Sequence, residues 1–306
     1  MRKFKYISSI STEDIKSNNV IPCIDEEGNH CILIKNSVMK KVETKFSTDN
    51  LKVQLDSVLH LDGEEFYFHI ITAVKNYLYS ANQFEVIYDY IFKKIDEPIS
   101  GMEMNILITS IEDYFRTTPE KDLFSLQVGV YGELFVIKYL YELGYKEIID
   151  KYHNNFYSKH DIEINEKIRI EIKSTNSEKR IHTFKHNQIF RSDIEVFVVS
   201  VMLEQSEEDM SLFDLFEEIK NFYSDPDSLL GLDKLMKRCN VSEEKRGLSF
   251  SAMKAYNDIR IFDAKSLPKI NIEAPDGVTN IKYDVDCSLG NSINVESFIK
   301  YIRCNA

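Results

Sequence analysis

Two carboxylates and a lysine lie at the spacing of a β-hairpin in the middle of the sequence. Asp161 begins the run Asp-Ile-Glu-Ile, and Glu171 and Lys173 end the run Ile-Arg-Ile-Glu-Ile-Lys. Both runs alternate between apolar and polar residues, which is the period of β-strands, and the turn falls near Asn165 and Glu166. In this hairpin Glu171 and Lys173 share one face, and we expect Asp161 to point to the same side.

The chemistry that such a cluster can perform is that of a divalent cation beside a phosphate. Two neighbouring carboxylates repel each other unless a cation lies between them, and hard oxygen ligands suit Mg²⁺ or Mn²⁺. A lysine beside the cation can orient or deprotonate a water molecule and can stabilise the charge on a phosphate. Phosphodiester hydrolysis requires these parts. The alternative is a charged, chemically inert strand face at the protein surface.

Three flanking segments must position the hairpin. Residues 123–144 predict a long helix that is apolar nearly all round and therefore lies inside the protein. Glu133 is an isolated carboxylate on this helix, so its burial requires a partner or a metal; the alternative is a turn cap or a pair with a lysine. After the hairpin, a short helix is predicted at 183–190. Val196–Leu203 predicts a strand that is apolar on both faces, as at the centre of a sheet.

The remainder of the chain is mixed in character. Residues 1–75 predict mostly strands, in a small antiparallel sheet. Helical periodicity follows from about residue 82, and the C-terminal third mixes helices with strands. We therefore expect a β-rich N-terminal region, a central region with the hairpin and its preceding helices, and a mixed C-terminal region, at residues 1–80, 81–210 and 211–306.

The composition limits the class of protein. The chain has 306 residues, of which 43% are apolar, which is enough for a sizeable core. The longest apolar run spans about eight residues, whereas a membrane helix needs ~20, so no membrane span is expected. Five widely spaced cysteines without a Cys-x-x-Cys pattern favour free thiols. No apolar segment of signal-peptide length follows the basic N-terminus, and these features together predict a cytoplasmic protein.

The charge is unevenly distributed. A net charge of −12 argues against a general nucleic-acid coat protein. Residues 167–191, here called the basic strip, nevertheless hold seven Lys or Arg against two Glu. This strip predicts contacts with a nucleic-acid backbone, or else a solvated surface. The candidate contacts are Lys179, Arg180, His182 and Lys185. Residues 204–218 hold seven acidic residues and favour protein partners.

The spacing Asp-x9-Glu-x-Lys resembles the PD-(D/E)xK nuclease superfamily, whose core runs helix, three strands, helix, strand. A narrower resemblance, to bacterial PD-(D/E)xK proteins of about this length found near phage-defence and restriction genes, covers most of the chain. The superfamily's proline before the aspartate is absent, and His160 takes its place. The matching segments are Gly129–Leu134, His160–Ile164, Ile170–Thr175, Arg180–Ile189, Leu267–Ile270 and Gly277–Val285.

The resemblance implies an α/β (α+β) protein with a restriction-endonuclease-like core, a β-rich N-terminal region and a mixed C-terminal extension. It implies a metal-dependent DNA endonuclease of the restriction or anti-phage defence type. Asp161, Glu171 and Glu133 would hold Mg²⁺ or Mn²⁺, and Lys173 and Gln188 would complete the catalytic set.

Other functions remain compatible with this resemblance. The main alternative is a nuclease-fold scaffold subunit of a defence complex, which binds DNA or protein and has little activity of its own. A third possibility is a nuclease that acts on RNA or on a non-B-form substrate. A homodimer is also implied, because cutting two strands needs two sites.

Overall fold

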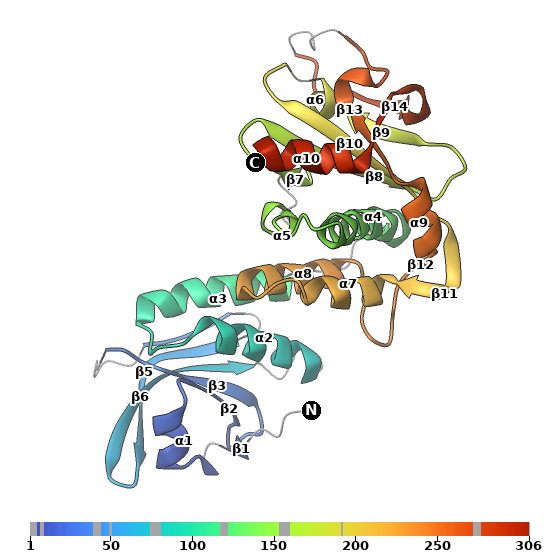
Figure 1. The fold of residues 1–306 in the computed structure, drawn as a ribbon. Coiled ribbons are helices and arrows are strands. Elements are labelled where there is room, and N and C mark those ends of the chain that lie inside the picture. Colours follow the sequence, from blue (N-terminus) through green and yellow to red (C-terminus); the bar gives the residue numbers. More distant parts are fainter. Residues whose placement is uncertain are drawn as a thin grey trace. The chain divides into compact units, whose positions relative to one another are not determined.

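Contacts within the chain define two units in the computed structural model, which describes residues 5–6, 9–38, 44–48, 51–73, 81–116, 122–152, 160–190, 192–271 and 277–305. Unit 1 comprises Met1–Thr118 and Asp225–Lys234, and unit 2 comprises Pro119–Ser224 and Leu235–Ala306. The predicted mixed α/β class is confirmed (Figure 1). The regions predicted at 1–80, 81–210 and 211–306 do not coincide with the units, and that division stays a prediction.

Unit 1 is built on a six-stranded sheet with the strand order β1-β2-β3-β6-β5-β4. All neighbouring strands are antiparallel except β1 and β2, which are parallel. The hairpin between β5 and β6 turns at Asp62 and Gly63, which both have positive φ, as a tight hairpin turn requires. The strands are β1 Lys5–Tyr6, β2 Val20–Ile24, β3 His30–Lys35, β4 Thr44–Ser47, β5 Leu51–Leu61 and β6 Glu64–Ala73.

Helices cover the apolar residues of this sheet. One buried cluster joins strand residues such as Ile32 and Val53 to helix residues such as Ile91 and Ile111. The first part of α8 belongs to the same unit, because Asp227 accepts a hydrogen bond from the Tyr90 hydroxyl at 3.1 Å. The helices are α1 Thr12–Ser17, α2 Ala81–Lys94, α3 Gly101–Arg116 and α8 Pro226–Arg238.

Unit 2 contains a five-stranded mixed sheet with the order β15-β13-β10-β8-β7. β7 and β8 form the antiparallel hairpin predicted from the sequence, and β10 is the central strand, as its apolar faces predict. β8 and β10 are parallel, so the chain must cross over between them, and β9 and α6 lie in that crossover. The bounds are β7 Ile162–Glu163, β8 Ile168–Thr175, β9 Ile181–Lys185, α6 His186–Ile189, β10 Glu195–Met202, β13 Arg260–Asp263 and β15 Ser292–Ile293.

Both faces of this sheet are covered (Figure 1). On one face, α4 packs on β8 and α10 packs on β10, where Phe197 meets Phe298 with ring centroids 5.1 Å apart. On the other face, β9 pairs with β14 in a small antiparallel sheet whose Phe184 and Val285 join a buried cluster with Val198 of β10. The remaining elements are α4 Leu123–Glu142, α5 Ile148–Lys151, β11 Gln205–Ser211, α7 Leu212–Lys220, β12 Ser249–Phe250, α9 Ala252–Asp258, β14 Lys282–Asp286 and α10 Val295–Asn305.

Helix α4 is the buried helix that the sequence predicts. Its first turn is capped by Asp122, whose side chain accepts from the Ser125 backbone, and the chain leaves it at Gly144 with a positive φ. Among the described residues, it is the one helix long and apolar enough to cross a membrane. More than half of that window is buried inside the protein, as in the core helix of a soluble domain. The cytoplasmic location stays a prediction.

Two local expectations are corrected or completed by the structure. The helix predicted at 183–190 is present only as α6, because residues 181–185 alternate between exposed and buried positions and pair with β14 as strand β9. All five cysteines are free, as expected; four are buried and Cys304 is exposed.

Candidate functional site

The hairpin of β7 and β8 brings the two predicted carboxylates together. Ile162 stands opposite Ile170 and Glu163 opposite Arg169, so the next position places Asp161 opposite Glu171. Asp161 Oδ2 accepts a hydrogen bond from the Ile172 backbone N–H at 2.6 Å, which fixes the carboxylate against β8. The local alternation of residues is sufficient to produce this arrangement, since opposite residues of an antiparallel pair point to the same side.

Glu171 is the centre of the site. Its side chain is 2% exposed, and its Oε1 receives Lys173 Nζ at 2.7 Å and Gln188 Nε2 at 2.6 Å. Its Oε2 is buried without a hydrogen bond from the described residues, although His160 Nδ1 lies 3.3 Å away. A buried carboxylate oxygen that lacks a donor is costly, so this atom is a natural position for a cation.

Gln188 reaches Glu171 from the crossover. Its Nε2 donates to the carboxylate, while its Oε1 accepts from the Lys185 backbone N–H at 2.9 Å at the start of α6. Because both ends of the amide are bound, Gln188 holds Glu171 in one orientation. The structure thus brings together Gln188, Glu171 and Lys173 from two separate elements.

Glu133 joins the same cluster from helix α4. Its Oε2 accepts a hydrogen bond from the Tyr152 hydroxyl at 2.9 Å. Burial outweighs the Tyr152 hydrogen bond, which lowers the pKa of Glu133, and together with the charge of Glu171 it raises that pKa to about 7. Glu133 is therefore near enough to Glu171 for the two charges to interact, as the predicted site requires.

The pKa values of Asp161 and Lys173 also depend on burial and on the charges of the neighbouring side chains. Burial, followed by the charges of Glu171 and Glu133, raises the pKa of Asp161 well above its ordinary value. Burial lowers the pKa of Lys173, but the neighbouring carboxylates, first Glu171, outweigh burial and leave that pKa raised. Lys173 is accordingly a cation at neutral pH and can stabilise negative charge, whereas a protonated amine cannot act as a base.

The donor set fits a hard divalent cation. Glu133, Asp161 and Glu171 offer oxygen ligands, and their mutual repulsion favours a cation among them. No group of three or more His, Cys, Asp or Glu side chains among the described residues is arranged to hold an ion. A Mg²⁺ site does not need one, because Mg²⁺ usually binds one or two carboxylates and keeps several water molecules.

The four predicted DNA contacts divide into two pairs. Lys179 and Lys185 are exposed. Arg180 donates instead to the Ser200 carbonyl at 2.8 Å and to the Asp258 carbonyl at 2.5 Å. His182 is 5% exposed, with its Nε2 2.6 Å from Ser200 Oγ. These placements favour the two lysines as contacts and give Arg180 and His182 internal partners.

Sequence reasoning did not select three residues that shape the site. Tyr152 binds Glu133, His160 lies beside Glu171, and Gly132 lets α4 approach β8. His160 had a signal in the sequence, because it replaces the superfamily's proline. Tyr152 and Gly132 had none, since their roles depend on how a helix docks on a strand distant in the chain.

Comparison with known proteins gives one match. The model of one protein family, described as "Putative PD-(D/E)XK family member, (DUF4420)", matches residues 4–288. No curated protein and no solved structure matches the chain.

Proposed function

Because the chain belongs to this PD-(D/E)xK family, we propose that it is a metal-dependent DNA endonuclease of the restriction or anti-phage defence type. The single observation that carries the proposal is the arrangement around Glu171. One of its oxygens receives Lys173 and Gln188, and the other is buried, accepts no hydrogen bond from the described residues and lies 3.3 Å from His160 Nδ1. Apart from the one-turn helix α5, the chain order α4, β7, β8, β9, α6, β10 supports the restriction-endonuclease-like core, with β9 in the small sheet that it forms with β14.

Asp161 and Glu171, with Glu133 beside them, would hold Mg²⁺ or Mn²⁺. When bound, the ion supplies polarisation of the phosphate and a lowered pKa for a water molecule. Lys173 stays protonated, because its carboxylate neighbours raise its pKa, and it stabilises the negative charge that develops on the phosphate. Gln188 acts as a positioning residue, since it fixes the orientation of the Glu171 carboxylate.

The proposal extends to the substrate and the assembly. Lys179 and Lys185 of the basic strip would bind the DNA backbone by charge, since both are exposed. A homodimer would supply two sites for two strands. Sedimentation of the purified protein with and without a DNA duplex measures its oligomeric state.

A cleavage assay tests the activity and the site together. Purified protein is incubated with plasmid and phage DNA in Mg²⁺, Mn²⁺ or EDTA, beside Lys173→Ala. We expect cutting in Mg²⁺ or Mn²⁺ and none in EDTA. The cutting rate of the variant should be at least about 100-fold lower, which is the smaller of the losses seen when one charge-stabilising group is removed. Lys300→Ala is the matched control, because Lys300 is an exposed lysine on α10 of the same unit.

Three results would contradict the proposal. Equal cutting by wild type and Lys173→Ala would mean that the activity does not come from this site. A folded protein that cuts no DNA and binds no divalent metal would favour the scaffold alternative, in which the nuclease fold holds DNA or protein. Cutting of RNA but not DNA would assign the third alternative.

A further inference from the structure

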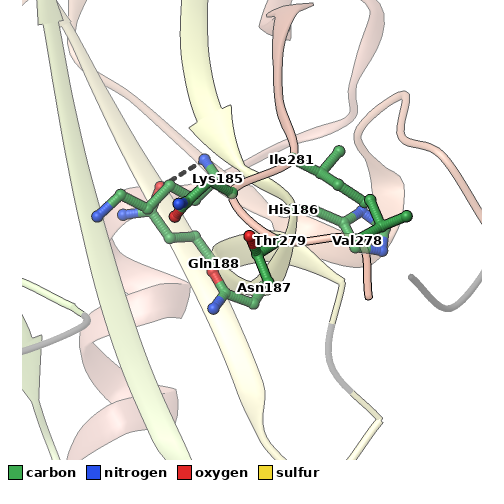
Figure 2. A pocket seen from close by; sticks show the side chains of 8 residues that line it. Lys185, His186, Asn187, Gln188, Val278, Thr279 and Ile281 are labelled. Atoms are coloured by element: carbon green, nitrogen blue, oxygen red, sulfur yellow. Dashed lines mark hydrogen bonds between the residues drawn. The ribbon is translucent and has the colours of Figure 1, made fainter. Parts of the chain in front are cut away.

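A cavity of about 440 Å³ lies directly beside the proposed site, and the mechanism above leaves it unused. Its walls come from α6 and from the segment that precedes β14 (Figure 2). This volume lies within the range of pockets that bind small organic ligands. The lining residues are Lys185, His186, Asn187, Gln188, Val278, Thr279, Asn280 and Ile281.

One side chain connects the cavity with the carboxylate cluster. Gln188 lines the cavity, and its Nε2 donates to Glu171 Oε1 at 2.6 Å. Whatever occupies the cavity therefore lies one side chain away from the proposed metal ligand. If a phosphate of a DNA strand is bound at Glu171, the group one side chain away from it is the adjoining nucleotide.

The two walls are joined and do not depend on a ligand to come together. The His186 backbone N–H donates to the Ile281 carbonyl at 2.9 Å. The His186 ring stacks on Phe190, with centroids 4.7 Å apart and an interplanar angle of 18°, and its Nδ1 lies 3.3 Å from the Tyr283 hydroxyl. The cavity is accordingly preorganised, which reduces the entropic cost of binding.

The lining offers two kinds of surface. Figure 2 shows Lys185 and Gln188 on one side of the view, and His186 with Val278 and Ile281 on the other. Asn187 and Asn280 add amides that can both donate and accept hydrogen bonds, and Val278 presents an apolar side chain that is 46% exposed. A nucleobase has the complementary properties, because its faces are flat and apolar and its edges carry donors and acceptors.

We infer that this cavity holds one nucleobase of the cleaved strand, next to the cut phosphodiester, and reads its edge through Asn187 and Asn280. The inference rests on the proposed function, since it takes the bound phosphate to lie at Glu171. A base that enters the cavity must leave the stack, at a cost that is smallest for an unpaired or mismatched base. Lys185 lines the same cavity and is exposed, so it can bind the phosphate of that nucleotide.

The first test measures the sequence preference at the cut. A library of random DNA duplexes is cut in Mg²⁺, and the new ends are sequenced. Asn187→Ala removes one amide, and Asn280→Gly removes the other without strain, because Asn280 has φ 57°. We expect each variant to lose about tenfold in base discrimination at one position beside the cut. Asn257→Ala, at an exposed position on α9, is the matched control and should keep the wild-type preference.

The second test does not depend on cutting. In EDTA, the Kd of a fluorescent single strand of about ten nucleotides, a length typical of single-strand sites, is compared with that of the same strand without bases. We expect wild type to bind the strand without bases about tenfold more weakly, and each variant, which keeps one of the two amides, to show a smaller difference between the two strands. Equal binding of the two strands by wild type overturns the inference, as does an unchanged cut preference in both variants. If the protein cuts no DNA but binds the strand with bases more tightly, the proposed activity is overturned and the cavity is still a site for a nucleobase.

Discussion

Gly132 of α4 faces Ser174 of β8 at a distance that leaves no room for a side chain. A Cβ atom built on Gly132 would lie 2.7 Å from Ser174 Oγ and closer still to Ser174 Cβ. The same Ser174 hydroxyl donates to the Val128 carbonyl of α4 at 2.8 Å. Since Glu133 follows Gly132 and Lys173 precedes Ser174, this close approach sets the separation of the helix carboxylate from the hairpin residues.

Gly132→Ala should therefore disturb the protein and its site together. Forcing a methyl group into a packed contact costs about 1–3 kcal/mol, which urea unfolding measures as a lower free energy of unfolding. We also expect weaker DNA cutting, because Glu133 moves away from Glu171. Gly129→Ala is the control on the same helix, since no atom lies within 4 Å of its added Cβ. It should gain up to about 1 kcal/mol through helix propensity, and equal losses in both variants would refute the close-approach argument.

Removal of the Asp161 carboxylate should leave the protein at least as stable as wild type without metal, and less stable than wild type when Mg²⁺ is bound. In EDTA, Asp161→Asn should be at least as stable as wild type. It removes a charge whose burial, followed by repulsion from Glu171 and Glu133, raises the Asp161 pKa, and its amide oxygen can still accept from Ile172. At a Mg²⁺ concentration about 100-fold above Kd, wild type should gain about 2.7 kcal/mol, and the variant much less. Thermal unfolding with and without Mg²⁺ measures both.

Glu166→Gln is the control for this change of charge. Glu166 is exposed in the turn of the same hairpin, so its variant should respond to Mg²⁺ as wild type does. An equal Mg²⁺ response in wild type and Asp161→Asn would show that Asp161 does not hold the ion.

The sequence predicted the parts of the site that local periodicity determines. Asp161, Glu171 and Lys173 lie in one hairpin whose alternating residues specify its register, so their common face follows from the chain itself. The apolar character of β10 likewise specified its central place in the sheet.

Contacts between distant segments could not be predicted in this way. Residues 183–185 were predicted to begin a helix, but residues 181–185 form β9 because β14 pairs with them. Thr183 and Asp284, which share a hydrogen bond, are 101 residues apart. The burial of His182 against Ser200 depends on the same pairing. A basic strip read along the sequence therefore included two side chains that the fold turns inward.

His182 should make the protein sensitive to acid. Burial, followed by the charges of Arg180 and Lys173, lowers the pKa of His182 to about 4. The unfolded chain takes up a proton near pH 6.5, so the unfolded state binds more protons between pH 6.5 and 4, and stability falls as the pH falls through that window. His182→Gln should lack this loss. Between pH 7 and 5 the loss in wild type should be about 2 kcal/mol larger than in the variant.

Urea unfolding at several pH values between 4 and 7.5 measures how the free energies of unfolding of wild type and His182→Gln depend on pH. His60→Gln is the control, because the His60 ring is exposed on β5, and its unfolding free energy should follow that of wild type. Parallel curves for His182→Gln and wild type would mean that the His182 ring is not enclosed.

The basic strip should separate into residues that bind DNA and residues that hold the fold. Lys179→Ala and Lys185→Ala should each weaken DNA binding for all sequences and reduce the slope of log K against log salt by about one, because each exposed lysine neutralises one phosphate. Arg180→Ala should instead lower the free energy of unfolding by about 2–3 kcal/mol, because its guanidinium hydrogen-bonds the Ser200 and Asp258 carbonyls. Fluorescence anisotropy over a range of salt and urea unfolding distinguish the two effects. If Arg180→Ala reduced the salt slope as much as the lysine variants and left stability unchanged, its guanidinium would face the DNA, and this division of the strip would be wrong.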